Sequence, residues 1–63
     1  MEEQLEQQRQ QCLYLCEKLI KELTKNKEDA EAFVGGDIYR AYVEATESAI
    51  RYAKRVRTKI RNI

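Results

Sequence analysis

The chain has 63 residues, of which 37% are charged and 43% are apolar, and it contains two cysteines and no histidine. A chain this short forms one domain and buries only about 60% of the surface that its unfolded form exposes, so its own core is marginal. The residue types for a disulfide framework or a metal centre, which stabilise many small domains, are scarce. We therefore expect an apolar face that a partner covers.

The net charge is +1, but the acidic and basic residues are unevenly distributed between the two halves of the chain. Residues 1–34 carry eight acids and five bases, whereas residues 35–63 carry three acids and seven bases. Halves of opposite sign suit an antiparallel hairpin or two chains side by side. No apolar run is long enough to cross a bilayer, and the acidic start is the reverse of a basic signal-peptide start. We expect a cytoplasmic protein that does not enter a membrane.

The first helix is predicted over residues 2–34. Its apolar residues recur mostly at steps of three and four, which is typical of one helix face, and Leu13, Leu15 and Ile20 widen that face. Asn26 interrupts the pattern and is followed by acids, as at a helix start. The sequence therefore permits a break near residues 24–27, with a kink or a short extra helix at 27–34. The apolar positions are Leu5, Cys12, Cys16, Leu19, Leu23, Ala30 and Phe33.

The adjacent pair Gly35 and Gly36 predicts a turn at residues 35–37, because these are the only glycines and the chain has no proline. A helix commonly ends where glycine takes a positive φ. Asp37 is a good N-cap for the next helix, since its carboxylate can accept from free backbone amides.

The second helix is predicted over residues 38–62. Its apolar and small residues alternate in steps of three and four without a break, which predicts a heptad seam. The middle of this seam is narrow, so that a neighbouring helix can approach closely. The seam consists of Tyr39, Tyr42, Thr46, Ala49, Ala53, Val56, Ile60 and Ile63.

Together these elements predict an all-α fold, an antiparallel helical hairpin in a single domain over residues 1–63. Two helices cannot cover both apolar faces, so we expect a homodimer forming a four-helix bundle, or docking on another protein. The packing or dimer seam is predicted at Leu5, Cys12, Cys16, Leu19, Leu23, Tyr42, Thr46, Ala49, Ala53, Val56 and Ile60.

The sequence offers little for catalysis. Without histidine no Ser–His or Cys–His pair can form, and most acids cluster where helical segments are predicted to begin. Cys12 and Cys16 lie on one helix face; packing inside the seam is favoured over a zinc site shared with a second chain or a redox switch. We expect no enzyme, no cofactor, no metal and no small-molecule substrate.

The C-terminal segment "RYAKRVRTKIRNI" holds six bases and no acid. Three interpretations are open: a solvated helix end, a nucleic-acid surface, or a site for an acidic protein. Tyr14 and Tyr52, at the edge of the seams, are candidate contacts for a partner. The leading hypothesis is a small regulatory or inhibitory protein-binding module, of phage or plasmid type. The alternative is a nucleic-acid-binding regulator using Arg51, Lys54, Arg55, Lys59 and Arg61.

Overall fold

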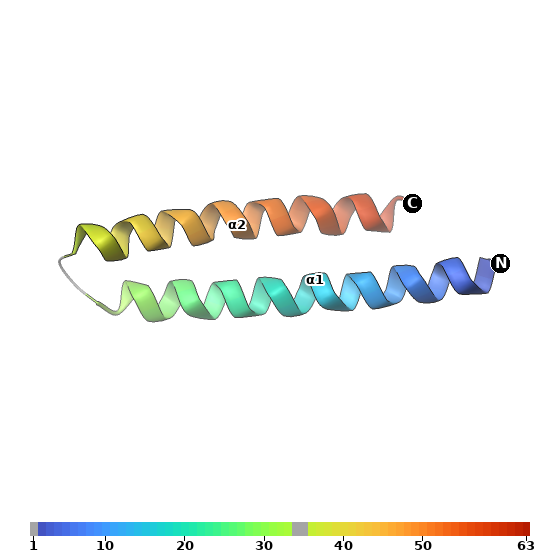
Figure 1. Cartoon of the computed structure of the whole chain (residues 1–63), viewed down its shortest axis with the longest axis horizontal. Coiled ribbons are helices and arrows are strands. Elements are labelled where there is room, and N and C mark those ends of the chain that lie inside the picture. Colours follow the sequence, from blue (N-terminus) through green and yellow to red (C-terminus); the bar gives the residue numbers. More distant parts are fainter. Residues whose placement is uncertain (1, 34–35) are drawn as a thin grey trace.

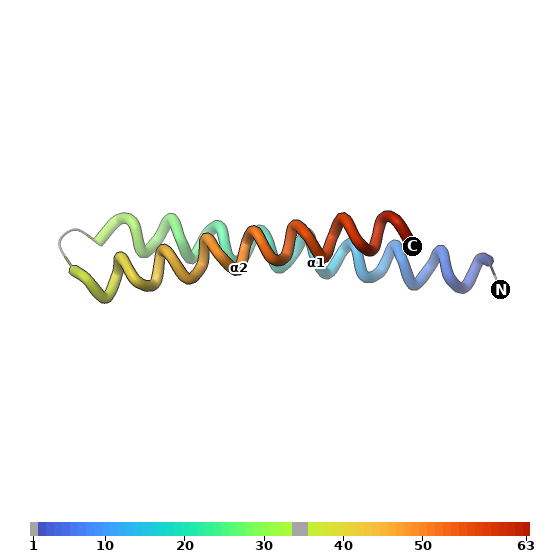
Figure 2. The backbone as a smooth tube through the Cα atoms, turned by 90° about the horizontal axis from the view of Figure 1, so that it is seen from above, coloured from blue at the N-terminus to red at the C-terminus, as the bar shows by residue number. Residues whose placement is uncertain are grey.

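The computed structural model describes residues 2–33 and 36–63, and in these residues the chain forms two antiparallel helices (Figure 1). Helix α1 spans Glu2–Glu31 and helix α2 spans Asp37–Arg61. The helices lie side by side along most of their length, and the N-terminal part of α1 extends past the end of α2 (Figure 1). Seen from above, they cross at a shallow angle (Figure 2). The predicted all-α hairpin is therefore confirmed.

Helix α1 is continuous through residues 24–27, so the permitted break is not present there, and residues 27–31 belong to this same helix and not to a separate short one. Asn26 sits inside the helix because the residues on either side of it are good helix formers and α2 packs alongside. The helix ends at Glu31, and the backbone amides of Ala32 and Phe33 donate to carbonyls of the last turn. This is earlier than the predicted end at residue 34.

Helix α2 begins one residue earlier than expected. Gly36 is the N-cap residue, with an extended φ of −129°, and Asp37 is the first helical residue. The prediction that Asp37 caps the helix is wrong, because no side chain bonds to the free amides there. Asp37 instead places a negative charge in the first turn, where it complements the helix dipole. Gly35 and Val34 lie outside the described residues.

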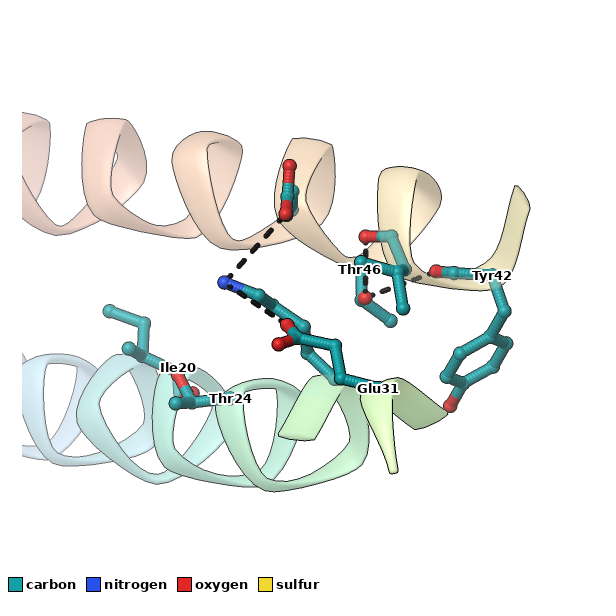
Figure 3. Close-up of polar contacts among 8 residues, drawn as sticks. Ile20, Thr24, Glu31, Tyr42 and Thr46 are labelled. Atoms are coloured by element: carbon teal, nitrogen blue, oxygen red, sulfur yellow. Dashed lines mark hydrogen bonds and ion pairs between the residues drawn. The ribbon is translucent and has the colours of Figure 1, made fainter. Parts of the chain in front are cut away.

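The contact between the helices buries only small side chains. Among the described residues, Ala30, Thr46 and Ala53 are buried, and no large side chain is fully enclosed. The hydroxyl of Thr46 is satisfied inside its own helix, because Oγ1 lies 3.0 Å from the carbonyl oxygen of Tyr42 and 2.9 Å from that of Val43 (Figure 3). One α-helical hairpin of this kind is a single layer without a core of its own.

The dimensions of the molecule also show that the hairpin is extended and has no closed core. The molecule measures 53 × 15 × 10 Å and has a radius of gyration of 15.1 Å, whereas a compact domain of this length has a radius of about 11 Å. Its accessible surface is 5402 Å²; a compact globular chain of 7.5 kDa has about 4,200 Å². The hairpin exposes roughly a thousand Å² more than a closed domain of its size.

Candidate functional site

The two broad sides of the hairpin differ in chemistry. One side, here called the charged face, carries the ion pairs that join α1 to α2. The other, here called the apolar face, carries shallow hollows between the helices. Helical periodicity places these sets on opposite sides of the contact line, because residues three or four apart share a side.

On the charged face, Lys27 holds the two helices together near the turn. Its Nζ lies 3.7 Å from Glu31 Oε1 on its own helix and 3.7 Å from Glu47 Oε1 on α2, as the dashed lines in Figure 3 show. All three side chains are partly exposed to solvent. Such exposed pairs contribute only about 0.2–1 kcal/mol each, so they set the register more than they stabilise the fold.

A second ion-pair cluster lies toward the open end of the hairpin. Arg57 Nη1 donates to Glu17 Oε1 at 2.7 Å, and Arg61 Nη2 lies 3.9 Å from the same oxygen. The hydrogen bond from Arg57, together with the nearby charges of Arg57, Arg61 and Lys21, lowers the pKa of Glu17 below its ordinary value. Partial desolvation opposes this shift. Two of the six C-terminal bases are thus neutralised within the chain.

The other four bases of the segment are differently placed. In the described part of the chain, no carboxylate lies within ion-pair distance of Arg51, Lys54, Arg55 or Lys59. All four are exposed, and Arg51 donates to the hydroxyl of Ser48 at 3.1 Å. Lys59 and Arg61 lie in the last turn, where cations complement the dipole. The helix dipole does not explain the bases at Arg51, Lys54 and Arg55, which lie before the last turn.

On the apolar face, three hollows follow one another from the open end to the turn, with volumes of about 160, 360 and 310 Å³. The central hollow lies over the narrow part of α2, where Ala49 and Ala53 leave space beneath Leu19, Leu23 and Tyr52. The main apolar side chains along these hollows are Leu5, Cys12, Cys16, Leu19, Leu23, Ala30 and Phe33 of the α1 half, and Ile38, Tyr42, Ala49, Tyr52, Ala53, Val56, Ile60 and Ile63 of the α2 half.

Many of these side chains remain open to solvent. Ile38 is 83% exposed, Tyr52 67% and Phe33 57%, and Leu5, Leu19, Tyr42 and Ile63 are exposed as well. At the turn, the rings of Phe33 and Tyr39 stack with centroids 4.8 Å apart. This stacked pair lies at the turn end of the contact between the helices, and Tyr39 is 42% exposed.

Some of the predicted seam residues are covered by the other helix of the hairpin, and the rest are exposed to solvent. In the predicted α1 seam, Cys16, Leu23 and Ala30 are at least partly covered by α2, whereas Leu5, Cys12 and Leu19 are exposed. The side chains that α2 covers in addition, Leu13 and Ile20, lie on the side turned toward the charged face. In α2, Thr46 and Ala53 are buried and Ala49, Val56 and Ile60 are half-buried, but Tyr42 is exposed.

The remaining candidates are on the surface. Tyr14 is 65% exposed and lies on α1 near Glu17 and Lys21, away from the apolar face. Cys12 and Cys16 are free thiols, exposed and half-buried respectively. The described residues hold no group of three or more His, Cys, Asp or Glu side chains that could bind a metal ion. Glu17 and Lys27 are the partners that sequence reasoning missed, because their pairing depends on the register across the turn.

Neither helix, in the part of the chain that the structure covers, is long and apolar enough to span a membrane. Comparison of the chain with protein-family models, with curated proteins and with solved structures found no match.

Proposed function

We propose that this protein is a small non-enzymatic interaction module, regulatory or inhibitory in role, whose working surface is the apolar face. In this proposal the face first pairs two chains into a four-helix bundle homodimer, which then presents its helices to another protein. The free thiols of Cys12 and Cys16 fit the reducing environment of the cytoplasm, which we propose as its location.

The observation that carries the proposal is the row of exposed apolar side chains along one side of both helices. Contiguous exposed apolar patches of more than a few hundred Å² are rare on monomeric proteins and mark interaction sites. The excess surface of the hairpin over a compact chain, roughly a thousand Å², compares with the about 800 Å² that each partner buries in a standard interface. Aromatic residues such as Tyr52 and Phe33 are typical anchors of such surfaces.

The opposite face does not offer the same surface. There Lys27 and Arg57 bridge the helices through carboxylates, and covering these charges would cost desolvation energy. A helix partner is therefore expected on the apolar face, where the side chains gain by burial at about 25 cal/mol per Å².

The test is a pair of matched substitutions read out as solution mass. Leu19→Glu places a charge in the centre of the apolar face, and Tyr14→Glu places the same charge on an exposed aromatic position of the same helix outside that face. Light scattering should show the unmodified protein and the Tyr14→Glu variant as dimers, and the Leu19→Glu variant as a monomer. Equal masses for the two variants would contradict the assignment of the apolar face.

A second candidate function rests on the bases that no carboxylate of the described residues neutralises. Arg51, Lys54 and Arg55 are exposed on one outer side of α2, and a dimer would carry two such sets. Neutralising several phosphates gives affinity that falls steeply with salt and is mostly independent of sequence. We expect the double variant Arg51→Glu/Arg55→Glu to lose binding to a mixed pool of DNA and RNA, with Lys21→Glu, at an exposed base of α1, as the control. Binding that is the same in all three proteins would exclude this surface.

A further inference from the structure

Seven apolar positions of α2 are arranged symmetrically about Ala49, whereas Tyr52 and Ile63, which also line the apolar face, stand outside this series. Moving outward from Ala49, the next positions in either direction are alanines four residues away, then a large residue after three, then an isoleucine after four. Residues at these steps share one side of a helix, and all of them except Ala45 line the hollows of the apolar face. The series is Ile38, Tyr42, Ala45, Ala49, Ala53, Val56 and Ile60.

Such a series fits a copy of itself running in the opposite direction. With Ala49 facing Ala49 of a second copy, Ala45 lies level with Ala53, and the larger Tyr42 and Ile38 lie level with Val56 and Ile60. Small residues then oppose small residues at the centre, which lets the two helices approach to about 8 Å. Large residues oppose large ones toward both ends, where the helices diverge.

Helix α1 carries a second symmetric set, formed by charges on its outer side. Lys18, Glu22, Lys25 and Asp29 are all exposed, and none is in an ion pair within the described residues. When two copies of α1 run antiparallel about a point between residues 23 and 24, Lys18 faces Asp29 of the second copy and Glu22 faces its Lys25. Every pair brings opposite charges together, which favours this register over others.

The two centres of symmetry lie at nearly the same level of the hairpin. The ion pairs place residue 17 beside residue 57 and residue 27 beside residue 47, so the α1 residue level with Ala49 is residue 25. The centre of the charged set, between residues 23 and 24, is about one and a half residues away, or roughly 2 Å along the helix. One two-fold axis, perpendicular to the helices, therefore serves both sets.

From this coincidence we infer that the partner on the apolar face is a second copy whose turn lies at the opposite end of the bundle, with α1 against α1, α2 against α2 and Ala49 on the two-fold axis. This inference rests on the proposed function, in which the apolar face is the binding surface. It adds the identity, direction and register of the occupant.

The competing arrangement places both turns at the same end and each α1 against the α2 of the other copy. It brings Lys18 within one residue of the level of Arg55 of the second copy, a pair of like charges, and Glu22 equally close to the level of Arg51, a pair of opposite charges, so its charge pairs are mixed. It also sets the central hollow of one copy, which lies off the axis toward the open end, directly over the same hollow of the other. The opposite-end arrangement offsets the two hollows, so that each faces side chains near the partner's Thr46.

Cysteine cross-linking separates the arrangements. At an interhelical distance of about 8 Å, Cα atoms that face each other across the axis are roughly 4–6 Å apart, which a disulfide can bridge. In a Cys12→Ala/Cys16→Ala background, Ala49→Cys should oxidise almost completely to a covalent dimer on a non-reducing gel. Tyr14→Cys, on the outer surface, is the matched control and should stay largely uncrosslinked. A second reporter, Lys18→Cys/Asp29→Cys, leaves α2 unchanged and should also cross-link between chains.

The competing arrangement is reported by Lys18→Cys/Arg55→Cys. Cross-linking of this variant, in a protein that light scattering shows to be a dimer and in which Ala49→Cys does not cross-link, would overturn the inferred direction while leaving the apolar face as the binding surface. A monomeric mass for every variant and for the unmodified chain would overturn both. A covalent dimer through residue 49 together with no product from Lys18→Cys/Arg55→Cys supports the opposite-end bundle.

Discussion

Ala53 is the most enclosed residue described, with 4% of its surface exposed, and its replacement by leucine tests the close packing of the two helices. The change adds three carbons at a point where α1 and α2 touch, while helix propensity changes little. Overpacking of this kind costs about 1–3 kcal/mol. A domain of this length has a total stability of only about 3–9 kcal/mol, so a large fraction of it is lost.

Thermal unfolding followed by circular dichroism measures this loss. For a domain of 60–100 residues, 1 kcal/mol corresponds to about 4–8 °C in Tm, so Ala53→Leu should lower Tm by at least roughly 4 °C. Ala41→Leu is the matched control, because it makes the same change on an exposed position of the same helix and should leave Tm nearly unchanged. Equal melting temperatures for the two variants would refute the close contact at Ala53.

Two further predictions concern the charged face. Because the pKa of Glu17 is lowered in the folded state, its ionised form stabilises the protein above its ordinary pKa of 4.5, and this contribution is lost as the pH falls through the lower folded value. Glu17→Gln should therefore be less stable than the unmodified protein at pH 7, and the difference should shrink as the pH falls below 4.5 in urea titrations; a difference that is constant with pH would contradict the pairing with Arg57. Lys27→Gln removes the exposed bridge to Glu31 and Glu47 and should cost no more than about 1 kcal/mol; a loss of 3 kcal/mol by the same titration would show that the bridge contributes far more than an exposed pair.

The helices and the hairpin could be predicted because their signals are local. The steps of three and four in α2, from Tyr39 to Ile60, predict a helix whatever lies beside it. The glycine pair marks the turn, since these residues separate two long patterns that contain no other glycine or proline. The capping role assigned to Asp37 was wrong by one position, because either Gly36 or Asp37 can begin the helix and the choice depends on the path of the turn.

Which side of α1 meets α2 could not be predicted from the pattern. The apolar strip of α1 is wide enough for two neighbours, with Leu13 and Ile20 along one margin and Leu5, Cys12 and Leu19 along the other. A heptad series predicts contact but does not say with how many helices. The structure resolves this for one neighbour: α2 covers Leu13 and Ile20 more fully than Leu5 and Leu19, which leaves the second margin for another chain.

The charged residues also differ in what could be predicted: their exposure depends on one helix, whereas their pairing depends on how the two helices are aligned. The exposure of Arg51 and Arg55 follows from the periodicity of one helix alone, because both residues lie away from the seam of α2. The pairing of Arg57 with Glu17 depends on the register between helices. The length and path of the turn set that register, and a shift of a single helical turn would bring a different acid opposite Arg57.

If this hairpin completes its fold by covering the apolar face with a second copy, its Tm depends on protein concentration. If folding is coupled to dimerisation, a hundredfold increase in concentration stabilises the dimer by about 2.7 kcal/mol and should raise Tm by roughly 10 °C. The mass at the higher concentration should be about twice the 7.5 kDa of one chain. A Tm independent of concentration, together with the mass of a single chain, would contradict the account.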